Sequence, residues 1–537
     1  MTDARVWWAP VALRGWKALA MFALSVIASY LLIGALRHGS WYILDDAEIL
    51  SWMGWKRHVP LSDAFALLGS TEAAAPGADQ RYRPLYYAFK VLECVLWGAN
   101  PVAWFNARIA LFALTIFGIW WALVAVTGPL WGTLLGWYTF TQYYWGDVWA
   151  HACLGEQYAA VCVAAMAVGG VLVGERLRDS ARADGPLMLM AASAFVAVGV
   201  KENFAVLVLP LAIALALCWR RRLAGPPAYA AALVAFGGAA FVIGAVLVGT
   251  MRSGGVDVYR NSTGLGSRAR LLLGKWPRVL ASALALCAVA ATAVRIWVRR
   301  ARPAARAATD RVLAQQAVVA AMVAIVFLSQ LVFYNGQFPT FGSRYDFPGR
   351  TTEIVVYASL IAGAGTMAQL LGLPRGLARF ACGGALSLRA LGGGFHVRDV
   401  TFVYVERTSA MRVAIATVLQ RAGAGDVPVL LISTDPGDYE SAMVVGGLLR
   451  TMRAPNPVFL APPRYSARQT ADPFAAAVGR EMRRIAHDGF AQVYLLPRGD
   501  FTATLARAGG RCVALRLHAY DPFEPWPCDP HTLEGEQ

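Results

Sequence analysis

The sequence predicts a polytopic α-helical membrane protein with a small α/β domain at its C-terminal end, and three observations lead to this prediction. Of the 537 residues, 57% are hydrophobic and only 15% are charged, and the mean hydropathy is +0.48; soluble domains carry about 25% charged residues. Apolar runs of about 20 residues recur between short Arg-rich or Gly/Pro-rich breaks. After residue 395, strand-like runs alternate with amphipathic segments, which is typical of an α/β domain.

The membrane part, residues 1–372, is predicted to hold about ten spans. The first is too long for a cleavable signal, and "LRHGSWYILDD" behind it lacks a small-residue cleavage site. The segment "RYRPLYYAFKVLECVLWGANP" is broken by Arg83-Pro84, Lys90 and Glu93, so we expect a helix along the membrane surface. The predicted spans are 17–36, 105–126, 129–145, 156–174, 187–200, 204–219, 228–249, 278–298, 312–333 and 351–372.

The Arg-rich loops set the orientation of these spans. With the N-terminus inside, the clusters "GERLRDSARADG", "WRRRLAGPP", "VRRARPAARAATDR" and "PRGLARF" all fall on the inner side, as the positive-inside rule requires. The net charge of +16 comes from the membrane part of the chain, because residues 396–537 contain 15 Arg and 15 Asp plus Glu and are therefore neutral. Basic residues that set membrane orientation and meet anionic lipids argue against a nucleic-acid-binding protein.

A Gly-rich connector, residues 373–395, leads to the predicted α/β domain, residues 396–537. Its expected strands are "VTFVYV", "VPVLLIS", "PVFLAP", "AQVYLLP" and "CVALRLHAY", and the intervening amphipathic segments indicate a largely parallel sheet. Because the N-terminus is predicted inside and an even number of spans, ten, follows it, this domain is expected on the inner side. Eight scattered cysteines form no CxxC or metal-ligand pattern, although Cys512 and Cys528 could pair in an oxidising compartment.

Ionisable residues gather at the outer ends of the predicted spans. Five outer connections supply them, and the segment 251–278, with six Lys or Arg and one Asp, lies on the same side. Ionisable groups near bilayer depth are costly and usually functional. Glu48 is expected to be only solvated. The candidate site residues are Asp45, Asp46, Arg81, Arg83, Asp147, His151, Glu156, Lys201, Glu202, Arg260, Lys275, Arg344 and Tyr345.

This mixture of groups suits glycosyl transfer from a lipid phosphate. A carboxylate can take the proton of an attacking hydroxyl, while Arg and Lys side chains bind a phosphate and stabilise it as it leaves. The polyprenyl tail of such a donor would lie in apolar grooves between spans. Its phosphate would sit at the membrane surface, where the candidate residues are predicted to lie.

Four motifs resemble the GT-C glycosyltransferases, particularly the bacterial relatives of the protein O-mannosyltransferases and of the tetratricopeptide-bearing mannosyltransferases. Asp45-Asp46 resembles the acidic pair that opens the first outer loop of that family. The other motifs are "YRPL" followed by "GANP", "KE" followed by an apolar run that reaches "LP", and the later "SRYDFP". Together they cover roughly residues 17–372.

The resemblance implies an inverting transferase that moves a sugar from a polyprenyl-phosphate donor to a hydroxyl of a glycan, lipid or protein, at the outer face of a bacterial inner membrane. It implies that Asp45 is the general base and that Asp46 orients Asp45 or the acceptor. Arg83, Lys201 and Arg344 become candidates for binding the donor phosphate or for holding the outer loop. The wider substrate-binding set adds Arg81, Glu202 and Tyr345, and less specific candidates are Asp147, His151, Glu156, Arg260 and Lys275.

Two departures from the family leave the substrates open. "VAWFNARIALF" lacks the His expected after the "GANP" break, and no tetratricopeptide repeat follows the membrane part. Mycobacterial-type arabinosyltransferases share the fold and an early acidic pair, so the sugar is a hexose or a pentose.

The sequence favours two other functions and a bound metal less strongly. A transporter or flippase of lipid-linked glycans is less favoured, because the sequence has no internal repeat and its charges gather at one surface. An O-antigen ligase or polymerase that uses diphosphate-linked donors is the other alternative. Asp45, Asp46 and Glu202 could hold a hard divalent ion, but with a monophosphate donor the protein's own cations suffice, and no metal is the favoured expectation.

Overall fold

The computed structural model describes most of the N-terminal half and parts of the C-terminal domain. The described residues are 15–41, 46–74, 82–252, 347, 354–359, 361–363, 374, 396–423, 427–432, 438–454, 456–461, 493–495, 505–518 and 521–526. Predicted spans 278–298 and 312–333 lie outside these residues, and 351–372 is described only in part.

The described part of the N-terminal half consists of helices joined by short connections. Five segments are long and apolar enough to cross a membrane: Trp16–His38, Pro101–Thr127, Gly155–Asp179, Glu202–Arg220 and Pro226–Gly249. The elements are α1 (Trp16–Ile33), η1 (Gly34–His38), α2 (Asp46–Met53), η2 (Gly54–Lys56), α3 (Leu61–Gly69), α4 (Pro84–Leu96), α5 (Pro101–Thr127), α6 (Pro129–Phe140), α7 (Tyr143–Trp149), α8 (Gly155–Asp179), α9 (Asp184–Val200), η3 (Glu202–Leu207), α10 (Val208–Arg220) and α11 (Pro226–Arg252).

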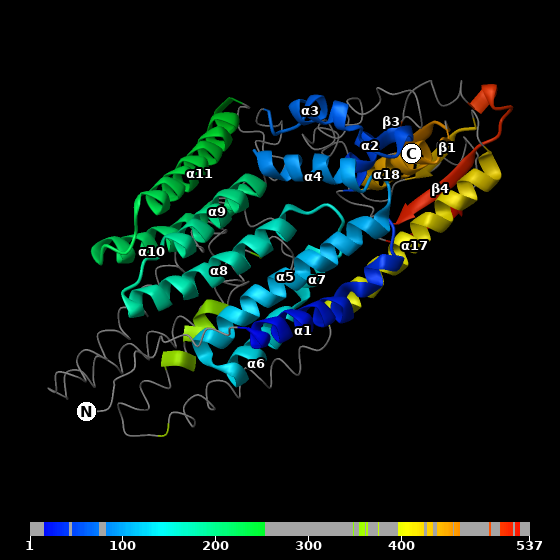
Figure 1. Cartoon of the computed structure of the whole chain (residues 1–537). Helices are drawn as coiled ribbons and strands as arrows, with labels where there is room; N and C mark the ends of the chain where they lie inside the picture. The colour runs from blue at the N-terminus through cyan, green and yellow to red at the C-terminus, as the bar shows by residue number, and fades with distance from the viewer. Residues whose placement is uncertain are drawn as a thin grey trace, which may run out of the picture.

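The long helices pack side by side in a row. Contacts link α1 to α5, α5 to α8, α8 to α9 and α9 to α11, and Figure 1 shows these helices running in roughly the same direction. At one end of this row, α1 leads through η1 to α2, and we call this end the α2 end. At the opposite end, the α8–α9 and α10–α11 turns meet through a hydrogen bond from Ala183 N to Leu223 O of 2.9 Å.

Helix α1 shows why these helices suit a bilayer. Its buried positions Met21, Ser25, Ser29 and Leu32 recur every three or four residues, as one helical face requires, and the Ser29 hydroxyl donates to Ile109 O of α5 at 2.7 Å. The remaining surface carries exposed large apolar side chains, among them Leu19, Leu24, Ile27 and Leu31. A lipid environment would cover this exposed apolar surface.

One predicted span differs in detail from the helices observed, whereas the predicted surface helix is present. The predicted span 129–145 is two shorter helices, α6 and α7, which are interrupted after Phe140. The predicted surface helix is α4, whose 13 residues give a length of about 20 Å, too short to cross a bilayer.

The "GANP" motif has a local structural explanation. Gly98 has a φ of +53°, and a Cβ there would lie 2.5 Å from Arg57 O, so only glycine fits. Asn100 caps α5 by accepting a hydrogen bond from Val102 N at 3.2 Å, and Pro101 occupies the first turn, where proline is favoured. The motif therefore ends α4 and starts α5.

The C-terminal domain contains the predicted, mainly parallel sheet. Strand β1 (Val429–Ile432) lies between β2 (Val458–Ala461) and β4 (Val513–His518), and the sheet order is β3-β2-β1-β4-β5. Val429 pairs in parallel with Val458 on one side and with Val513 on the other. β3 (Val493–Leu495) is parallel to β2, whereas β5 (Asp521–Trp526) is antiparallel to β4. The two long helices described in this domain are α17 (His396–Ala422) and α18 (Asp438–Thr451).

The predicted first strand of this domain, "VTFVYV", is wrong. These residues lie inside the 27-residue helix α17. The buried positions Val397, Thr401, Tyr404, Thr408 and Met411 repeat every three or four residues, which is the period of a helix. Packing along this face overrides the strand preference of the local β-branched residues.

The C-terminal domain packs against the α2 end of the helical row. Helix α18 contacts α2, where a Cβ built at Gly447 would lie 2.8 Å from Leu50 Cβ, and Ser40 N donates to Thr408 Oγ1 of α17 at 3.1 Å. Figure 1 shows the sheet and α18 beside α2. The domain therefore shares a side with α2, and the expected placement of the two on opposite sides of the membrane is wrong. Cys512 is disulfide-bonded, which suits an oxidising compartment outside the cytoplasm.

Cysteine labelling in sealed vesicles tests this arrangement. Lys56→Cys, after α2, and Arg421→Cys, on α17, are expected to react with a membrane-impermeant maleimide from the same side. Arg222→Cys, in the α10–α11 turn, is the control and should react only from the other side; all three native residues are exposed. Labelling of positions 56 and 421 from opposite sides would contradict the packing of α18 on α2.

Candidate functional site

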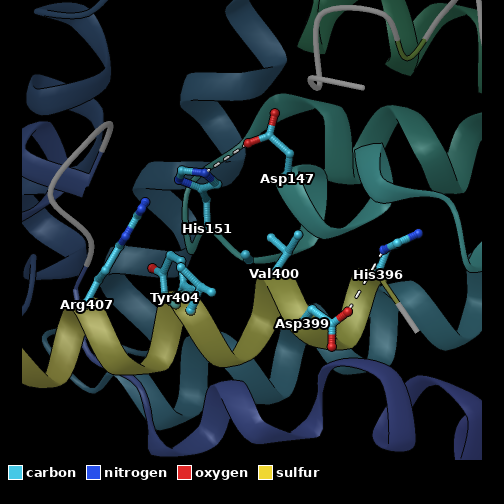
Figure 2. A pocket seen from close by; sticks show the side chains of 9 residues that line it. Asp147, His151, His396, Asp399, Val400, Tyr404 and Arg407 are labelled. Atoms are coloured by element: carbon cyan, nitrogen blue, oxygen red, sulfur yellow. Dashed lines mark ion pairs between the residues drawn. The ribbon is translucent and has the colours of Figure 1, made fainter. Parts of the chain in front are cut away.

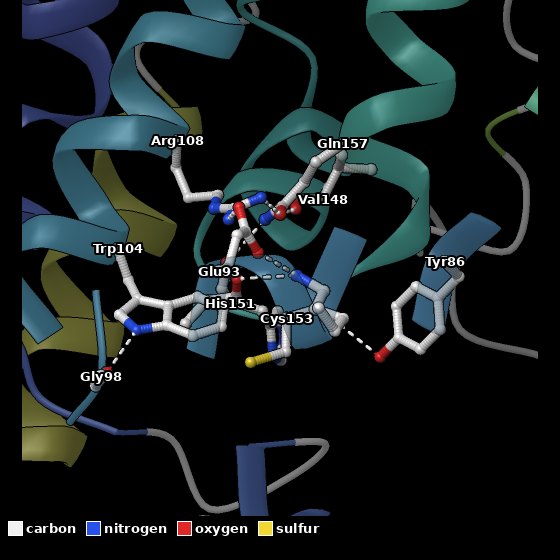
Figure 3. A network of polar contacts seen from close by, with 11 residues as sticks. Tyr86, Glu93, Gly98, Trp104, Arg108, Val148, His151, Cys153 and Gln157 are labelled. Atoms are coloured by element: carbon white, nitrogen blue, oxygen red, sulfur yellow. Dashed lines mark hydrogen bonds and ion pairs between the residues drawn. The ribbon is translucent and has the colours of Figure 1, made fainter. Parts of the chain in front are cut away.

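The candidate site lies at the α2 end, where α2, α4, α5, α8 and η3 converge. A buried charged cluster of Lys90, Glu93 and Arg108 forms its base (Figure 3). Glu93 Oε2 accepts a hydrogen bond from Lys90 Nζ at 3.2 Å, and Glu93 Oε1 accepts one from Arg108 Nη2. One carboxylate is thus shared by two cations whose side chains are 0% exposed.

The surroundings of this cluster set its protonation. Burial raises the pKa of Glu93, but attraction from Arg108 and Lys90 outweighs burial and leaves this pKa below its usual value. Burial lowers the pKa of Lys90, although Glu93 opposes the shift. Lys90 Nζ also lies 5.1 Å from the Tyr158 ring centroid and 5.3 Å from that of Trp104, so cation–π attraction supports its charge.

The cluster holds the loop between α7 and α8. Arg108 Nη1 donates to Gln157 Oε1 at 3.0 Å, and Gln157 Nε2 donates to His151 O at 2.6 Å. Lys90 Nζ donates to Ala152 O at 3.3 Å, and the Tyr86 hydroxyl donates to Cys153 O at 2.9 Å. The loop backbone is therefore fixed by side chains from α4 and α8, and Arg108 of α5 orients one of them, Gln157.

Asp46 meets this loop at its Cys153 end. Asp46 begins α2 and is 0% exposed. Burial raises the pKa of the Cys153 thiol, and the neighbouring Asp46 carboxylate, which is hydrogen-bonded to it, raises this pKa further. Glu48 is half-buried, with its charge near Tyr86, so the expectation that it is only solvated is wrong.

Lys201 pairs with Glu156, which joins two predicted site residues from separate helices. Both side chains are buried, and Lys201 Nζ donates to Glu156 Oε1. Lys201 follows α9 and Glu156 lies in the first turn of α8, so the pair ties these two helix ends together.

Arg83 also has a carboxylate partner. Its Nε and Nη2 both donate to Glu72 Oε2 at 3.1 Å, and its Nη2 donates to the Tyr87 hydroxyl at 3.2 Å. Burial lowers the pKa of Arg83, but Glu72 outweighs burial, so the pKa is raised and the charge is kept. Arg83 therefore connects the start of α4 to the segment after α3.

Buried polar atoms without hydrogen-bond partners among the described residues lie beside Lys201. Glu202 Oε2 and both polar atoms of the Asn203 side chain have no hydrogen-bond partner among the described residues, and Asn203 is only 2% exposed. A buried amide without partners costs about 1–3 kcal/mol. An unpaired group of this kind calls for a physical explanation, and contact with a ligand is one.

Substitution of Asn203 separates stability from activity. Asn203→Leu removes two unpaired polar groups at similar volume, so the unfolding temperature is expected to stay constant or rise while activity falls about tenfold. The control is Asn456→Leu, which removes a buried amide that donates to Val427 O at 3.0 Å and should lower the unfolding temperature. A loss of stability in Asn203→Leu equal to that of the control would contradict a ligand-contacting role.

Asp147 and His151 lie apart from the charged cluster, in a pocket against α17 (Figure 2). His151 Nε2 is 3.5 Å from Asp147 Oδ1. The cavity has a volume of about 260 Å³, and His396, Asp399 and Arg407 line its α17 side. The structure therefore divides the candidate residues between two places, although His151 O contributes to the loop held by Gln157.

Six predicted site residues lie outside the described residues. They are Asp45, Arg81, Arg260, Lys275, Arg344 and Tyr345. Asp45 is also one of the three residues proposed to hold a divalent ion. Within the described part of the chain, no group of three or more His, Cys, Asp or Glu side chains is placed to hold a metal.

Four residues of the site were not predicted from the sequence: Lys90, Glu93, Arg108 and Gln157. The sequence signal for them was present, because Lys90 and Glu93 interrupt an apolar segment and Arg108 falls inside a predicted span. Charged residues at such positions usually pair with one another. Their pairing across α4 and α5 could not be predicted from either segment alone.

Comparisons with known proteins found one structural likeness. No family model matches the chain, and no curated protein matches it in sequence. A crystal structure of ArnT from Cupriavidus metallidurans in the apo state matches 93% of this chain and 92% of that chain, with 13% sequence identity and a TM-score of 0.42.

Proposed function

We propose that the protein is an inverting glycosyltransferase that moves a sugar from a polyprenyl-phosphate donor to an acceptor hydroxyl. The reaction takes place at the outer face of a bacterial inner membrane, and the acceptor is a glycan, lipid or protein. The observation that carries the proposal is the convergence of Asp46, Lys201 and Glu202 with the buried cluster at one end of apolar helices. The GT-C-like motifs of the sequence support the same reaction.

The proposed reaction uses Asp45 as the general base. The acceptor hydroxyl attacks the anomeric carbon, its proton passes to the Asp45 carboxylate, and the bond from the anomeric carbon to the phosphate oxygen breaks. Polyprenyl phosphate leaves as an anion, so no general acid is required. Asp46, buried at the start of α2 beside Cys153, fixes the backbone that carries its neighbour.

The charge pairs suggest a role for two of the cationic candidates. Arg83 is engaged by Glu72, and Lys201 by Glu156, so we assign both residues to holding the framework. We assign the donor phosphate to Arg344, with Arg81, Arg260, Lys275 and Tyr345 as further candidates. Glu202 and Asn203 are assigned to hydroxyl groups of the sugar or acceptor, because buried polar atoms without partners can bind them.

A transfer assay with purified protein in nanodiscs tests this function. A synthetic polyprenyl-phosphate sugar and a cell-envelope extract as acceptor should release polyprenyl phosphate, detected by mass spectrometry, and omission of the extract should stop the release. The matched polyprenyl-diphosphate sugar is the control and should not react. Turnover of the diphosphate donor alone would favour a ligase or polymerase, and movement of intact donor across the membrane without release would favour a flippase.

A further inference from the structure

A second polar site lies between the α2 end and the C-terminal domain. A cavity of about 540 Å³ opens there, bounded by Trp41 after η1, by Pro101 at the start of α5, and by residues of α17 and α18. Three arginines line it: Arg57 after η2, Arg412 on α17 and Arg453 after α18. We call this cavity the three-arginine pocket.

The described lining of the three-arginine pocket carries an excess of positive charge. Among the residues that the structure describes, it contains three arginines and no carboxylate. All three side chains are exposed, and none makes an ion pair within the described part of the chain. Three like charges that converge from separate elements repel one another, so an anion in the pocket would relieve the repulsion.

The backbone holds two of these arginines in an unusual conformation. Arg57 has a φ of 64° and Arg453 a φ of 59°, and both line the pocket. Only four described non-glycine residues have a positive φ, and the others are Ser180 and Arg222. Glycine or asparagine is the usual choice at such helix-terminal positions, and strained backbone is concentrated at ligand sites.

The helix ends near the pocket leave its net charge positive. The first residue of α5, Pro101, and the last residue of α18, Thr451, both line the cavity. A helix end carries roughly half a unit charge, positive at the N-terminus and negative at the C-terminus. The two ends therefore nearly cancel, and the three arginines decide the sign.

A pair of tryptophans separates the three-arginine pocket from the buried cluster. The Trp41 ring lies edge-on to the Trp104 ring with 5.5 Å between centroids. Lys90 and Arg108 lie 5.3 Å and 5.7 Å from the Trp104 ring centroid. Trp41 lines the pocket, whereas neither Lys90 nor Arg108 does, so the two polar sites are distinct.

We propose that the three-arginine pocket binds a phosphate or diphosphate group at the membrane surface. The arginine fork matches phosphate oxygens and forms charge-assisted hydrogen bonds to them. Because α1 and α5 are apolar enough to cross a membrane and their α2 ends border the pocket, it lies at the level of lipid headgroups. The phosphate belongs to a headgroup or to a water-soluble molecule. The proposal does not depend on the transferase reaction.

A dye attached at the pocket tests this proposal in the full-length protein. Met452 lines the pocket and is 48% exposed, so an environment-sensitive fluorophore on Met452→Cys reports locally. Titration with pyrophosphate in phosphatidylcholine nanodiscs should give a saturable signal if the phosphate comes from water. A response only in nanodiscs that contain phosphatidic acid would assign the site to a headgroup, and either response supports phosphate binding.

Substitutions of the arginines complete the test. Arg57→Gln and Arg412→Gln should each weaken the response about tenfold, and the combined Arg57→Gln, Arg412→Gln and Arg453→Gln variant should abolish it. The control is Arg222→Gln, since Arg222 is also exposed and has a φ of 56° but lies in the α10–α11 turn. A signal that responds to neither probe, or that survives in a folded triple variant, would overturn the proposal.

Discussion

Asp45→Asn is expected to lower the rate of sugar transfer by about 10²–10⁴-fold while donor binding stays unchanged, because an amide cannot accept the proton of the attacking hydroxyl. The variant keeps the size of the side chain, so the start of α2 should remain folded. Single-turnover kinetics with a polyprenyl-phosphate sugar measure the rate, and equilibrium binding of the donor measures affinity.

The neighbouring acids provide matched controls for Asp45→Asn. Asp46→Asn should lower the rate by less, since Asp46 is buried beside Cys153 and positions its neighbour. Glu48→Gln, two residues further along α2, should leave the rate within about twofold of the wild type, because no proton transfer is assigned to it. Full turnover by Asp45→Asn, or an equal loss in all three variants, would contradict the assignment of Asp45 as the base.

Glu93→Gln is expected to destabilise the protein by about 3–5 kcal/mol, because removing one partner of a buried ion pair leaves a buried charge uncompensated. In this case two cations, Lys90 and Arg108, lose their shared carboxylate. A fall in the apparent unfolding temperature in detergent measures the effect. Replacing the whole cluster with Lys90→Met, Glu93→Leu and Arg108→Met should recover much of the lost stability.

The dependence of stability on pH gives a second measure of the same cluster. The pKa of Glu93 is lower in the folded protein than its ordinary value of 4.5. Its contribution to stability is therefore complete above pH 4.5 and is lost as the pH falls through the lower folded pKa. Glu93→Gln should lack this part of the acid dependence. Asp63→Asn, which breaks an exposed pair with Lys56, is the control and should leave the unfolding temperature unchanged.

Much of the helical architecture could be predicted from the sequence, because apolar runs of sufficient length leave few other structures in a bilayer. The parallel sheet was also predictable from its apolar strands, and β1, β2, β3 and β4 all fall within expected runs. The helical structure of "VTFVYV" was not predictable, because its local preference for a strand is outweighed by the contacts of α17 with α1, η1 and α7. Those contacts join segments more than 240 residues apart in the sequence.

The candidate site could be predicted only in part. The sequence correctly indicated that Lys201 and Glu156 lie at the same end of the helices, yet their direct pairing depends on how α8 and α9 pack. Glu72, the partner of Arg83, lies in a polar segment with no distinguishing motif. The packing of the C-terminal domain on α2 was not predicted, because span counting uses every predicted helix and one miscounted span reverses the expected side.

In the proposed reaction, the acceptor hydroxyl displaces the phosphate in a single step, with the help of a carboxylate at the outer face. The anomeric configuration of the transferred sugar tests this single displacement most directly. A ¹³C-labelled polyprenyl-phosphate sugar of known configuration would be turned over by the wild-type protein, and the product would be examined by NMR through the one-bond coupling at the anomeric carbon. Attack by the acceptor from the face opposite the phosphate predicts an inverted configuration in the product. A retained configuration would contradict direct displacement and would require a covalent sugar–enzyme intermediate instead.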